Sequence, residues 1–433
     1  MDIHQAIPLF TEAETCWHMK FKQKVAHVRL FLLVIALLFL PNLARADEGD
    51  EIYGGAQDAE GTPLPQTKAL FNKSLYSGID WKNVRKVSDL KELHAYVVEC
   101  ADKLMEDIPV VCIDGYEPTT LDVIGGTSAA WVKMTVVSED EDKDEMCLSL
   151  HMYYRSGARI ARAYLIKDTS GLTEEEQALY EIVEAIVKEI KEQDLSDPVK
   201  LLLIHDAIAQ SCSYFTTKQK FPIVANFLCA TGVFLDSKAN CQGYSDAFYM
   251  LAKMLGFNVG FCTGMTGGGL HIWNTIELDK KIYYVDVTWD DPFKEDNPNK
   301  DKLVNYIYFI APREVITQTH SWNDGYDIGD VQEDIDDKYF YTTDEYTDFN
   351  EQYYSLEDDD AMSGLVEIAD GIANEGAKRC FLMIPYNKQF SIANNVIKFL
   401  DKELHKLGWR GRFYVHISSN PKWKYMFYTI VLN

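Results

Sequence analysis

Three residues within one stretch of the chain could together perform thiol chemistry. Cys241 follows Asn240 at the start of an amphipathic segment, His271 begins an alternating segment, and Asp286 lies in the segment after it. A cysteine acts as a nucleophile when a histidine can exchange its proton, and an acidic group can orient the histidine ring. The stretch 240–292 therefore contains, in order, the residue types that acyl transfer through a thioester needs.

The cysteine is predicted to open a helix over 241–255. Apolar residues recur there at helical spacing, and Gly256 is a typical helix end. Asn240 is a favoured N-cap residue, so Cys241 would lie in the first turn. The unpaired amides and the helix dipole at that position favour an anion, such as a thiolate or a developing oxyanion. For the other cysteines, an inert structural role is the better interpretation.

The histidine and the aspartate are predicted to meet across a β-hairpin. Asp279-Lys280 fits a two-residue turn between two alternating segments. If the strands pair directly across this turn, His271 lies opposite Thr288, and Asp286 occupies a diagonal position on the same face. Asp286 would then orient the imidazole, while the other ring nitrogen faces Cys241.

The segment 263–269 contains four glycines among seven residues. Because no helix is expected after it, a phosphate-binding role is not predicted. We expect this segment to be a loop that curves beside the site or flexes over it. The sequence has no CxxC or Cys/His spacing typical of zinc, and the acidic segment 324–360 lacks the EF-hand spacing. We therefore predict no metal and no cofactor.

These residues resemble the core of the transglutaminase-like superfamily over positions 196–295. The matching motifs are Cys241-Gln242-Gly243-Tyr244, His271-Ile272-Trp273-Asn274 and Val285-Asp286-Val287-Thr288-Trp289-Asp290, with a lead-in helix at Ile204-His205-Asp206. The resemblance is nearer to exported bacterial members than to animal enzymes. It implies an α+β fold with a papain-like core, in which the cysteine-bearing helix packs on an antiparallel sheet.

The same resemblance implies a triad of Cys241, His271 and Asp286. It assigns Trp289, Asp290 and Asp291 to packing and loop closure. Calcium dependence is not implied, because the sequence shows neither the additional β-sandwich domains nor the calcium sites of animal transglutaminases.

Such a triad would attack an amide carbonyl and form an acyl-thioester. Attack by water would make the chain a cysteine protease, peptidase or amide hydrolase. Attack by an amine would make it a protein-glutamine acyltransferase that cross-links, and a catalytically silent binding or scaffold module is a third alternative. The pattern favours hydrolysis of a protein or peptide substrate, for example in the cell envelope, and gives neither the substrate nor the oligomeric state.

The first 46 residues indicate export. Basic residues between 20 and 29 precede an apolar run at 30–40, and Ala44-Arg45-Ala46 follows. This order is typical of a secretory signal peptide, and the run is shorter than the ~20 residues that span a bilayer. We expect a mature chain that begins at Asp47 and is periplasmic or extracellular, with Met1 or Met19 as the start of the signal. An uncleaved anchor helix, the one expected membrane contact, is the alternative.

The composition is that of an acidic globular protein. A chain of 433 residues is long enough for two or three domains, and its formal charge of −25 argues against nucleic acid or anionic membranes as partners. Nine cysteines in an exported chain allow disulfides, although the sequence does not assign pairs.

Two small α+β domains are expected to flank the core. The expected divisions are a linker or irregular arm at 47–80, an N-terminal domain at 81–170, the catalytic domain at 171–325, an acidic Tyr-rich linker at 326–360 and a C-terminal domain at 361–433. In the N-terminal domain, a helix is predicted over 87–107 and strands over 109–113, 131–137, 147–154 and 158–166. In the C-terminal domain, strands are predicted at 380–385, 413–417 and 424–432 and a helix at 394–407.

Overall fold

The computed structural model describes most of the chain from residue 78 onward. The described residues are 78–118, 129–140, 144–215, 226–267, 269–291, 304–323, 327, 329–335, 339, 351–355, 365–366, 369–375, 379–386, 388, 390–419, 422 and 425–432. The expected signal peptide and nearly all of the expected arm at 47–80 lie outside them. The described residues divide into two compact units, one within 78–188 and 200–335, the other within 189–199 and 339–432. Each unit is described by itself.

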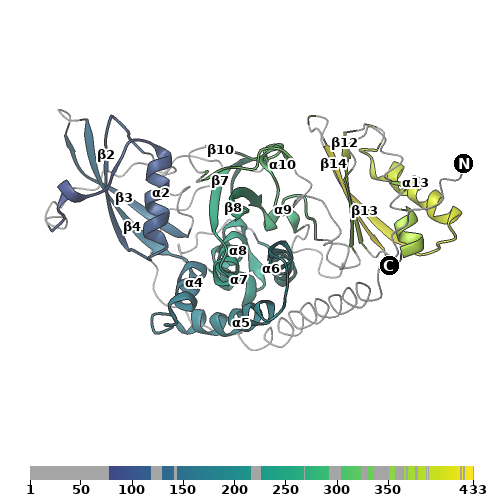
Figure 1. Cartoon of the computed structure of the whole chain (residues 1–433), viewed down its shortest axis with the longest axis horizontal. Helices are drawn as coiled ribbons and strands as arrows, with labels where there is room; N and C mark the ends of the chain where they lie inside the picture. Colours follow the sequence, from purple (N-terminus) through teal and green to yellow (C-terminus); the bar gives the residue numbers. More distant parts are fainter. Residues whose placement is uncertain are drawn as a thin grey trace, which may run out of the picture. The chain divides into compact units, whose positions relative to one another are not determined.

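The first unit begins with a four-stranded sheet covered by a helix (Figure 1). Its strands are β1 (Lys86–Val87), β2 (Asp107–Cys112), β3 (Ala130–Asp140) and β4 (Glu145–Tyr154), in the order β1-β2-β4-β3. The helix α2 (Leu90–Ala101) packs one apolar face against this sheet, as predicted. These elements form an α+β layer pair with its own core.

Residues 158–166 do not form the predicted strand. They belong to helix α4 (Ser156–Ile166), in which the residues at helical spacing are buried: Ala158, Ile160, Ala161 and Ala163. Gly157 explains why a helix fits here, because a Cβ at this position would lie 2.5 Å from Asp246 Oδ1. The glycine lets α4 pack closely against the helix that carries Cys241.

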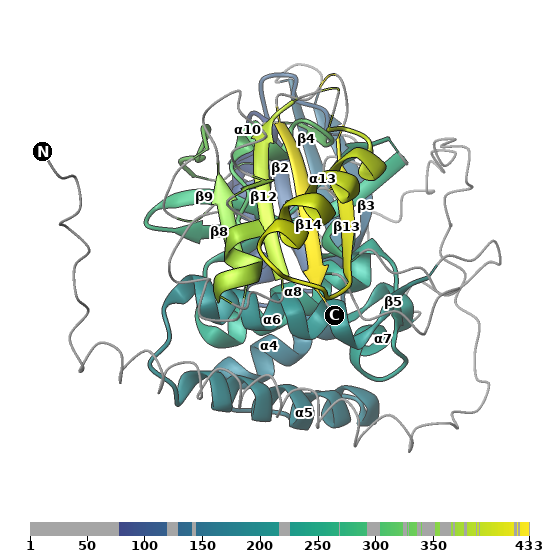
Figure 2. The same cartoon turned by 90° about the vertical axis from the view of Figure 1, so that its right-hand side faces the viewer.

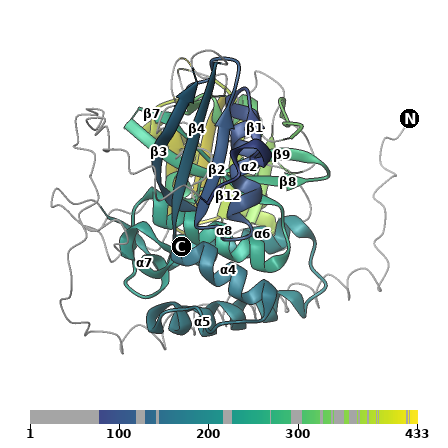
Figure 3. The ribbon, with the colours of Figure 1, turned by 90° about the vertical axis from the view of Figure 1, so that its left-hand side faces the viewer.

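Two longer helices follow. The helix α5 (Glu174–Lys191) begins with a capping box, in which Thr173 Oγ1 accepts from the Glu176 amide at 3.2 Å and the Glu176 carboxylate accepts from the Thr173 amide at 2.9 Å. It lies beside α4 (Figure 3), and Arg159 of α4 donates to Glu176 at 2.8 Å. The helix α6 (Asp197–Ser211) comes next. Within the described residues, every helix is too short or too polar to cross a membrane.

The central helix α8 (Cys241–Leu255) packs against β7 (Val259–Thr266) and β8 (Gly269–Leu278). With β9 (Lys281–Val285) and β10 (Ser321–Trp322), these strands form an antiparallel sheet in the order β10-β7-β8-β9. The remaining elements around α8 are short: β5 (Ser213–Tyr214), η3 (Asn226–Leu228), α7 (Ala230–Phe234), β6 (Lys238–Ala239), α9 (Val287–Asp290) and α10 (Arg313–Ile316). The cysteine-bearing helix therefore lies on an antiparallel sheet.

The glycine-rich segment 263–269 is not the loop that the sequence predicted. β7 continues to Thr266 and β8 starts at Gly269, so most of the segment belongs to a hairpin. Gly264 pairs with His271 and faces β10 so closely that a Cβ would lie 2.1 Å from the Ser321 carbonyl oxygen. The glycine is needed for strand pairing rather than for flexibility.

The second unit contains a separate four-stranded sheet and one long helix (Figure 2). The strands β11 (Glu351–Ser355), β12 (Arg379–Pro385), β13 (Phe413–Ser418) and β14 (Tyr425–Leu432) lie in the order β11-β12-β14-β13. The helix α13 (Ala393–Lys406) packs on the sheet through a buried cluster that includes Val396, Leu400, Met426 and Tyr428. The predicted strands and helix of this region are confirmed. The strand β11 was not predicted, because it lies in the range expected to be a linker and contains no run of apolar residues. It pairs in parallel with β12.

Candidate active site

Cys241 is fixed at the first residue of α8. Asn240 Oδ1 accepts hydrogen bonds from the backbone amides of Gln242 at 3.0 Å and Gly243 at 3.4 Å, as a helix N-cap should. Gly243 allows the first turn to approach η3, because a Cβ there would lie 2.7 Å from the Phe227 carbonyl oxygen. The cap and the close contact hold the position of the thiol.

The burial of the cysteines separates Cys241 from most of the others. The seven cysteines whose side chains the structure describes are free thiols, and of these only Cys147 and Cys241 are not buried. Cys147 lies on β4 in the N-terminal sheet. Cys241 is therefore the partly exposed thiol that also lies at a helix N-terminus.

His271 and Asp286 are joined directly by their side chains. The distance from His271 Nε2 to Asp286 Oδ2 is 2.7 Å, and the residues are 8% and 1% exposed. Two of the three predicted site residues are therefore in direct contact, and the Cys241 side chain lies near enough to His271 to raise its pKa. Because His271 Nε2 is bound to Asp286, Nδ1 is the ring nitrogen left for the thiol.

Asp286 reaches His271 by a different route from the predicted one. The register across the turn is as expected, with Leu278 opposite Lys281, but the β8–β9 pairing ends at Asn274 and Val285. Asp286 is instead the N-cap of α9, and its Oδ1 accepts from the amides of Thr288 at 3.0 Å and Trp289 at 3.2 Å. The predicted pairing of His271 with Thr288 is therefore wrong, because a helical turn replaces the strand.

The two ionisable side chains shift each other in opposite directions. Burial lowers the pKa of His271, but attraction to Asp286 and the hydrogen bonds to Asp286 and Cys241 outweigh it and raise the pKa to about 10. Burial raises the pKa of Asp286, but His271 and His320 hold it well below its usual range. An imidazolium beside an ionised carboxylate is therefore the favoured state at neutral pH.

A second histidine binds the same carboxylate oxygen. His320 Nε2 lies 3.0 Å from Asp286 Oδ2, and its ring is 2% exposed. The ligand atoms of His271, Asp286 and His320 all lie within 4.8 Å of one another, a spacing that a metal ion could use. The sequence reasoning missed His320, which lies just before the two-residue strand β10 and belongs to none of the motifs.

Tyr214 was also missed, although it contacts the thiol. It lies on β5, which pairs in parallel with β6 so that Tyr214 is opposite Ala239, two residues before Cys241. Its hydroxyl lies near enough to Cys241 for this residue to influence its pKa. Burial, and then the neighbouring Cys241, raise the pKa of Tyr214, so the phenol stays protonated at neutral pH and can donate a hydrogen bond beside the thiol.

A buried network anchors the tail of the third motif. His205 Nε2 lies 3.2 Å from Asp290 Oδ2, and its Nδ1 lies 3.4 Å from Asp206 Oδ1. Tyr306 donates to Asp206 at 2.7 Å. In addition, Tyr244 of α8 donates to Asp291 at 2.6 Å. Asp290 and Asp291 therefore hold α9 against α6 and α8, the packing role expected for them.

The back of α8 is held by a buried carboxylate. Asp246 Oδ2 accepts from the amides of Gly157 and Ala230, both at 2.9 Å. Burial raises the pKa of Asp246 to about 6, against the opposing attraction of Arg155. The Arg155 guanidinium is buried and lies 5.1 Å from the Trp131 ring centroid. This cluster joins the N-terminal sheet, α4 and α7 to the helix that bears the nucleophile.

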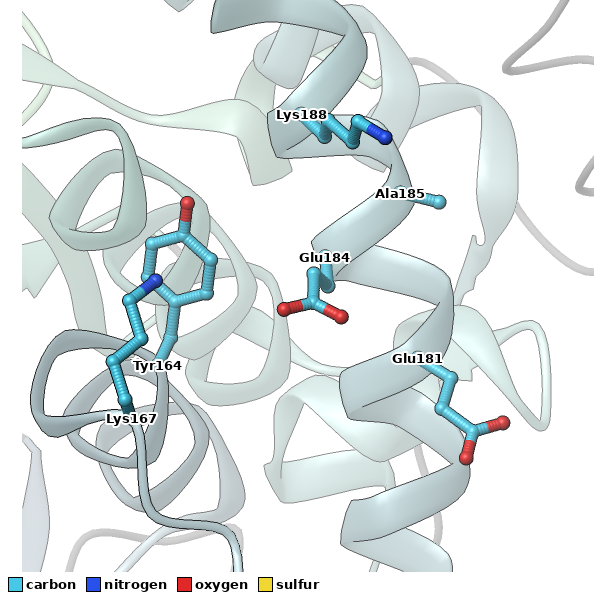
Figure 4. A pocket seen from close by; sticks show the side chains of 6 residues that line it. All are labelled: Tyr164, Lys167, Glu181, Glu184, Ala185 and Lys188. Carbon is cyan, nitrogen blue, oxygen red and sulfur yellow. The ribbon is translucent and has the colours of Figure 1, made fainter.

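The pocket in Figure 4 lies elsewhere on the first unit. It is formed between α4 and α5 and is lined by Tyr164, Lys167, Glu181, Glu184, Ala185 and Lys188. Lys167 Nζ lies 4.3 Å from the centroid of the Tyr164 ring, so the cation covers the aromatic face. None of the lining residues belongs to the Cys241 site, and none of them is a cysteine or a histidine.

Comparisons with known proteins give distant similarities. No family model and no curated protein matches the chain. One similar solved structure is a TGase, 14% identical, with 47% of this chain and 59% of that chain covered and a TM-score of 0.23. Another is a candidate protease from Parabacteroides distasonis, 8% identical, with 76% and 66% covered and a TM-score of 0.23. The chain thus spans under two thirds of each, and similarities at these TM-scores establish neither its fold nor its function.

Proposed function

We propose that this chain is a transglutaminase-like thiol enzyme that hydrolyses amide bonds of a protein or peptide substrate. The observation that carries the proposal is the linkage of a partly exposed helix-N-terminal thiol, Cys241, to His271 and then to Asp286. The three residues come from α8, β8 and the N-cap of α9, and the contacts between these elements support the proposal. A structural histidine would not require an ionised, buried partner on one side and a thiol on the other.

The proposed reaction proceeds in two steps. The Cys241 thiolate attacks the amide carbonyl carbon, and the C–N bond breaks as the His271 imidazolium donates its proton to the departing amine. Water then attacks the thioester while His271 accepts a proton, and the C–S bond breaks to release the carboxylic acid. The thiolate and the imidazolium are restored, and Asp286 stays ionised throughout.

A peptide library incubated with a labelled primary amine tests this function. Hydrolysis predicts cleaved peptides, or ammonia released from glutamine side chains, without incorporation of the label. Incorporation of the label into peptides would instead identify the reaction as amine transfer. The control is Cys241→Ala, and a Cys241→Ala protein with full turnover would refute the thiol mechanism.

We further propose that this chemistry takes place outside the cytoplasm. The support is the signal-like order of residues 20–46, which lie outside the described residues. N-terminal sequencing of secreted protein should read Asp47, whereas a reading at Met1 or Met19 would contradict cleavage.

A further inference from the structure

His320 has a more constrained hydrogen-bonding environment than its position outside the motifs suggests. Its Nε2 binds Asp286 Oδ2 at 3.0 Å, and its Nδ1 lies 2.7 Å from Thr319 Oγ1. Thr319 Oγ1 in turn lies 2.9 Å from the Tyr308 hydroxyl. Both ring nitrogens of a 2% exposed histidine are therefore occupied, one by the carboxylate that binds His271 and one by a hydroxyl chain.

Aromatic rings fix the plane of the His320 ring. Its centroid lies 4.7 Å from that of Trp273, 4.8 Å from that of Trp289 and 5.2 Å from that of Tyr308. The ring of His271 is 5.6 Å away. With its orientation set by packing, the imidazole presents Nε2 to Asp286 in one direction only.

We propose that His320 is a positioning residue for the thiol site, whose Nε2–H donates to Asp286 and holds this carboxylate for His271. The proposal rests on the proposed function, because it concerns the same Cys241–His271 pair. Asp286 then accepts four hydrogen bonds: two backbone amides bind Oδ1, and two imidazoles bind Oδ2. A carboxylate held from four directions cannot rotate away from His271.

The hydroxyl chain explains why the two imidazoles differ. Burial raises the pKa of the Tyr308 phenol, which therefore keeps its proton. If Tyr308 donates to Thr319 and Thr319 donates to Nδ1, the ring nitrogen of His320 that donates to Asp286 is Nε2. The two imidazoles then share one carboxylate oxygen but differ in their second neighbour, which is a hydroxyl for His320 and the Cys241 thiol for His271.

Substitutions at position 320 separate hydrogen bonding from packing. Glutamine places an amide N–H where histidine has Nε2, whereas the shorter asparagine and the apolar leucine do not. The readout is the rate constant for alkylation of Cys241 by iodoacetamide across pH in the chelator-treated full chain, with thermal unfolding as the check on folding. We expect His320→Leu and His320→Asn to slow alkylation at pH ~6 by about 10- to 100-fold, and His320→Gln to restore most of the rate.

Thr319→Val provides a second test that leaves the His320 ring in place. Removing the Thr319 hydroxyl takes away the partner of His320 Nδ1, so either ring nitrogen can carry the proton. Because the ring can still donate to Asp286, alkylation should slow by less than in His320→Leu. Equal losses in the glutamine, asparagine and leucine variants would overturn the proposal in favour of packing, and no loss in any of them would overturn it outright. Stoichiometric Zn²⁺ binding by the wild-type chain that disappears in His320→Gln would also overturn it, because the cluster would then be a metal site.

The same measurements distinguish this proposal from the proposed function. Alkylation needs no substrate, so a His320-dependent thiol in a chain that cleaves no amide would sink the hydrolase and leave the positioning role. A wild-type Cys241 that reacts no faster than free cysteine would sink both.

Discussion

The side chains of His205 and Asp290 form a 3.2 Å hydrogen bond with both groups fully removed from solvent. One residue lies on α6, and the other is the last residue of α9, the helical turn that Asp286 caps. The pair therefore connects the segment that carries Asp286 to the lead-in helix. Its loss should lower the free energy of unfolding more than it changes the reactivity of the thiol.

His205→Leu should lower the free energy of unfolding of the first unit by about 3–5 kcal/mol, because it leaves Asp290 buried without its partner. His205→Gln, which can still donate to Asp290, should cost clearly less. Urea denaturation of the full chain followed by tryptophan fluorescence measures both. Equal losses in the two variants would show that ring volume, rather than the hydrogen bond, matters.

The His205 contribution should also depend on pH in one direction. Burial lowers its pKa, but the hydrogen bonds to Asp206 and Asp290 outweigh this and raise it from 6.5 to about 9. The folded chain therefore holds a proton that the unfolded chain has lost, and the stabilisation is complete below pH ~6.5 and lost as pH rises through about 9. The difference in unfolding free energy between wild type and His205→Leu should shrink over that window. A difference that grows with pH would contradict the assignment.

Asn240→Ala should remove the cap of α8 and lower the free energy of unfolding by about 0.5–2 kcal/mol. The matched control is Asp89→Ala, because Asp89 caps α2 through a 2.8 Å hydrogen bond from the Glu92 amide, away from the thiol. The two variants should lose similar stability, but only Asn240→Ala should slow alkylation of Cys241. Slower alkylation in both would mean that general loosening, not the cap, controls the thiol.

Gly264→Ala should disrupt the pairing of β7 with β10, since a Cβ there meets the Ser321 carbonyl oxygen. We expect a loss of about 1–3 kcal/mol from overpacking and a slower Cys241 alkylation, because His320 precedes Ser321. Gly267→Ala is the control, since nothing lies within 4 Å of its added Cβ. A Gly264→Ala protein that keeps wild-type stability and alkylation would refute the role of this contact.

Amide hydrolysis should persist to high pH and then fall. Since Asp286 and Cys241 raise the pKa of His271 to about 10 against the effect of burial, the proton needed by the leaving amine is lost only as pH rises through that value. We expect kcat/KM for an amide substrate to fall above pH ~10, and less so for an activated ester, whose leaving group needs no proton. A fall beginning near pH 6.5 would indicate an ordinary imidazole.

The sequence was sufficient for elements with strong local signals. α8 has its predicted bounds because Asn240 and Gly256 mark both ends, and Gly256 adopts the expected left-handed conformation with φ +99°. The wrong predictions arose where the structure depends on contacts between segments that are distant in the sequence. The apolar residues of 158–166, interrupted by two arginines, are compatible with either a strand or a helix. The close approach of Gly157 to Asp246, which the sequence does not reveal, favours the helix. Asp286 was placed in a strand by extrapolating alternation, although its side chain caps a turn.

The site residues that were missed come from outside the motifs. Tyr214 reaches Cys241 through a two-residue parallel pair, and His320 reaches Asp286 from 34 positions further along the chain. Neither contact follows from periodicity or spacing, because each depends on how distant segments pack. The general α+β class was predictable from the sequence, whereas the surroundings of the carboxylate were not.

The segment after the third motif completes the structure around Asp286. The Tyr308 amide donates to Asp290 Oδ1 at 3.1 Å, and Tyr284 exchanges two backbone hydrogen bonds with Ala311 at 2.9 and 2.8 Å. A fragment that stops at Asp291 would keep all three motifs but lose both tethers and His320. Fragments 78–291 and 304–335, produced as separate polypeptides, have matching donors and acceptors through which they could reassemble. The smallest piece that keeps the surroundings of Asp286 therefore has its boundary well beyond the last motif residue.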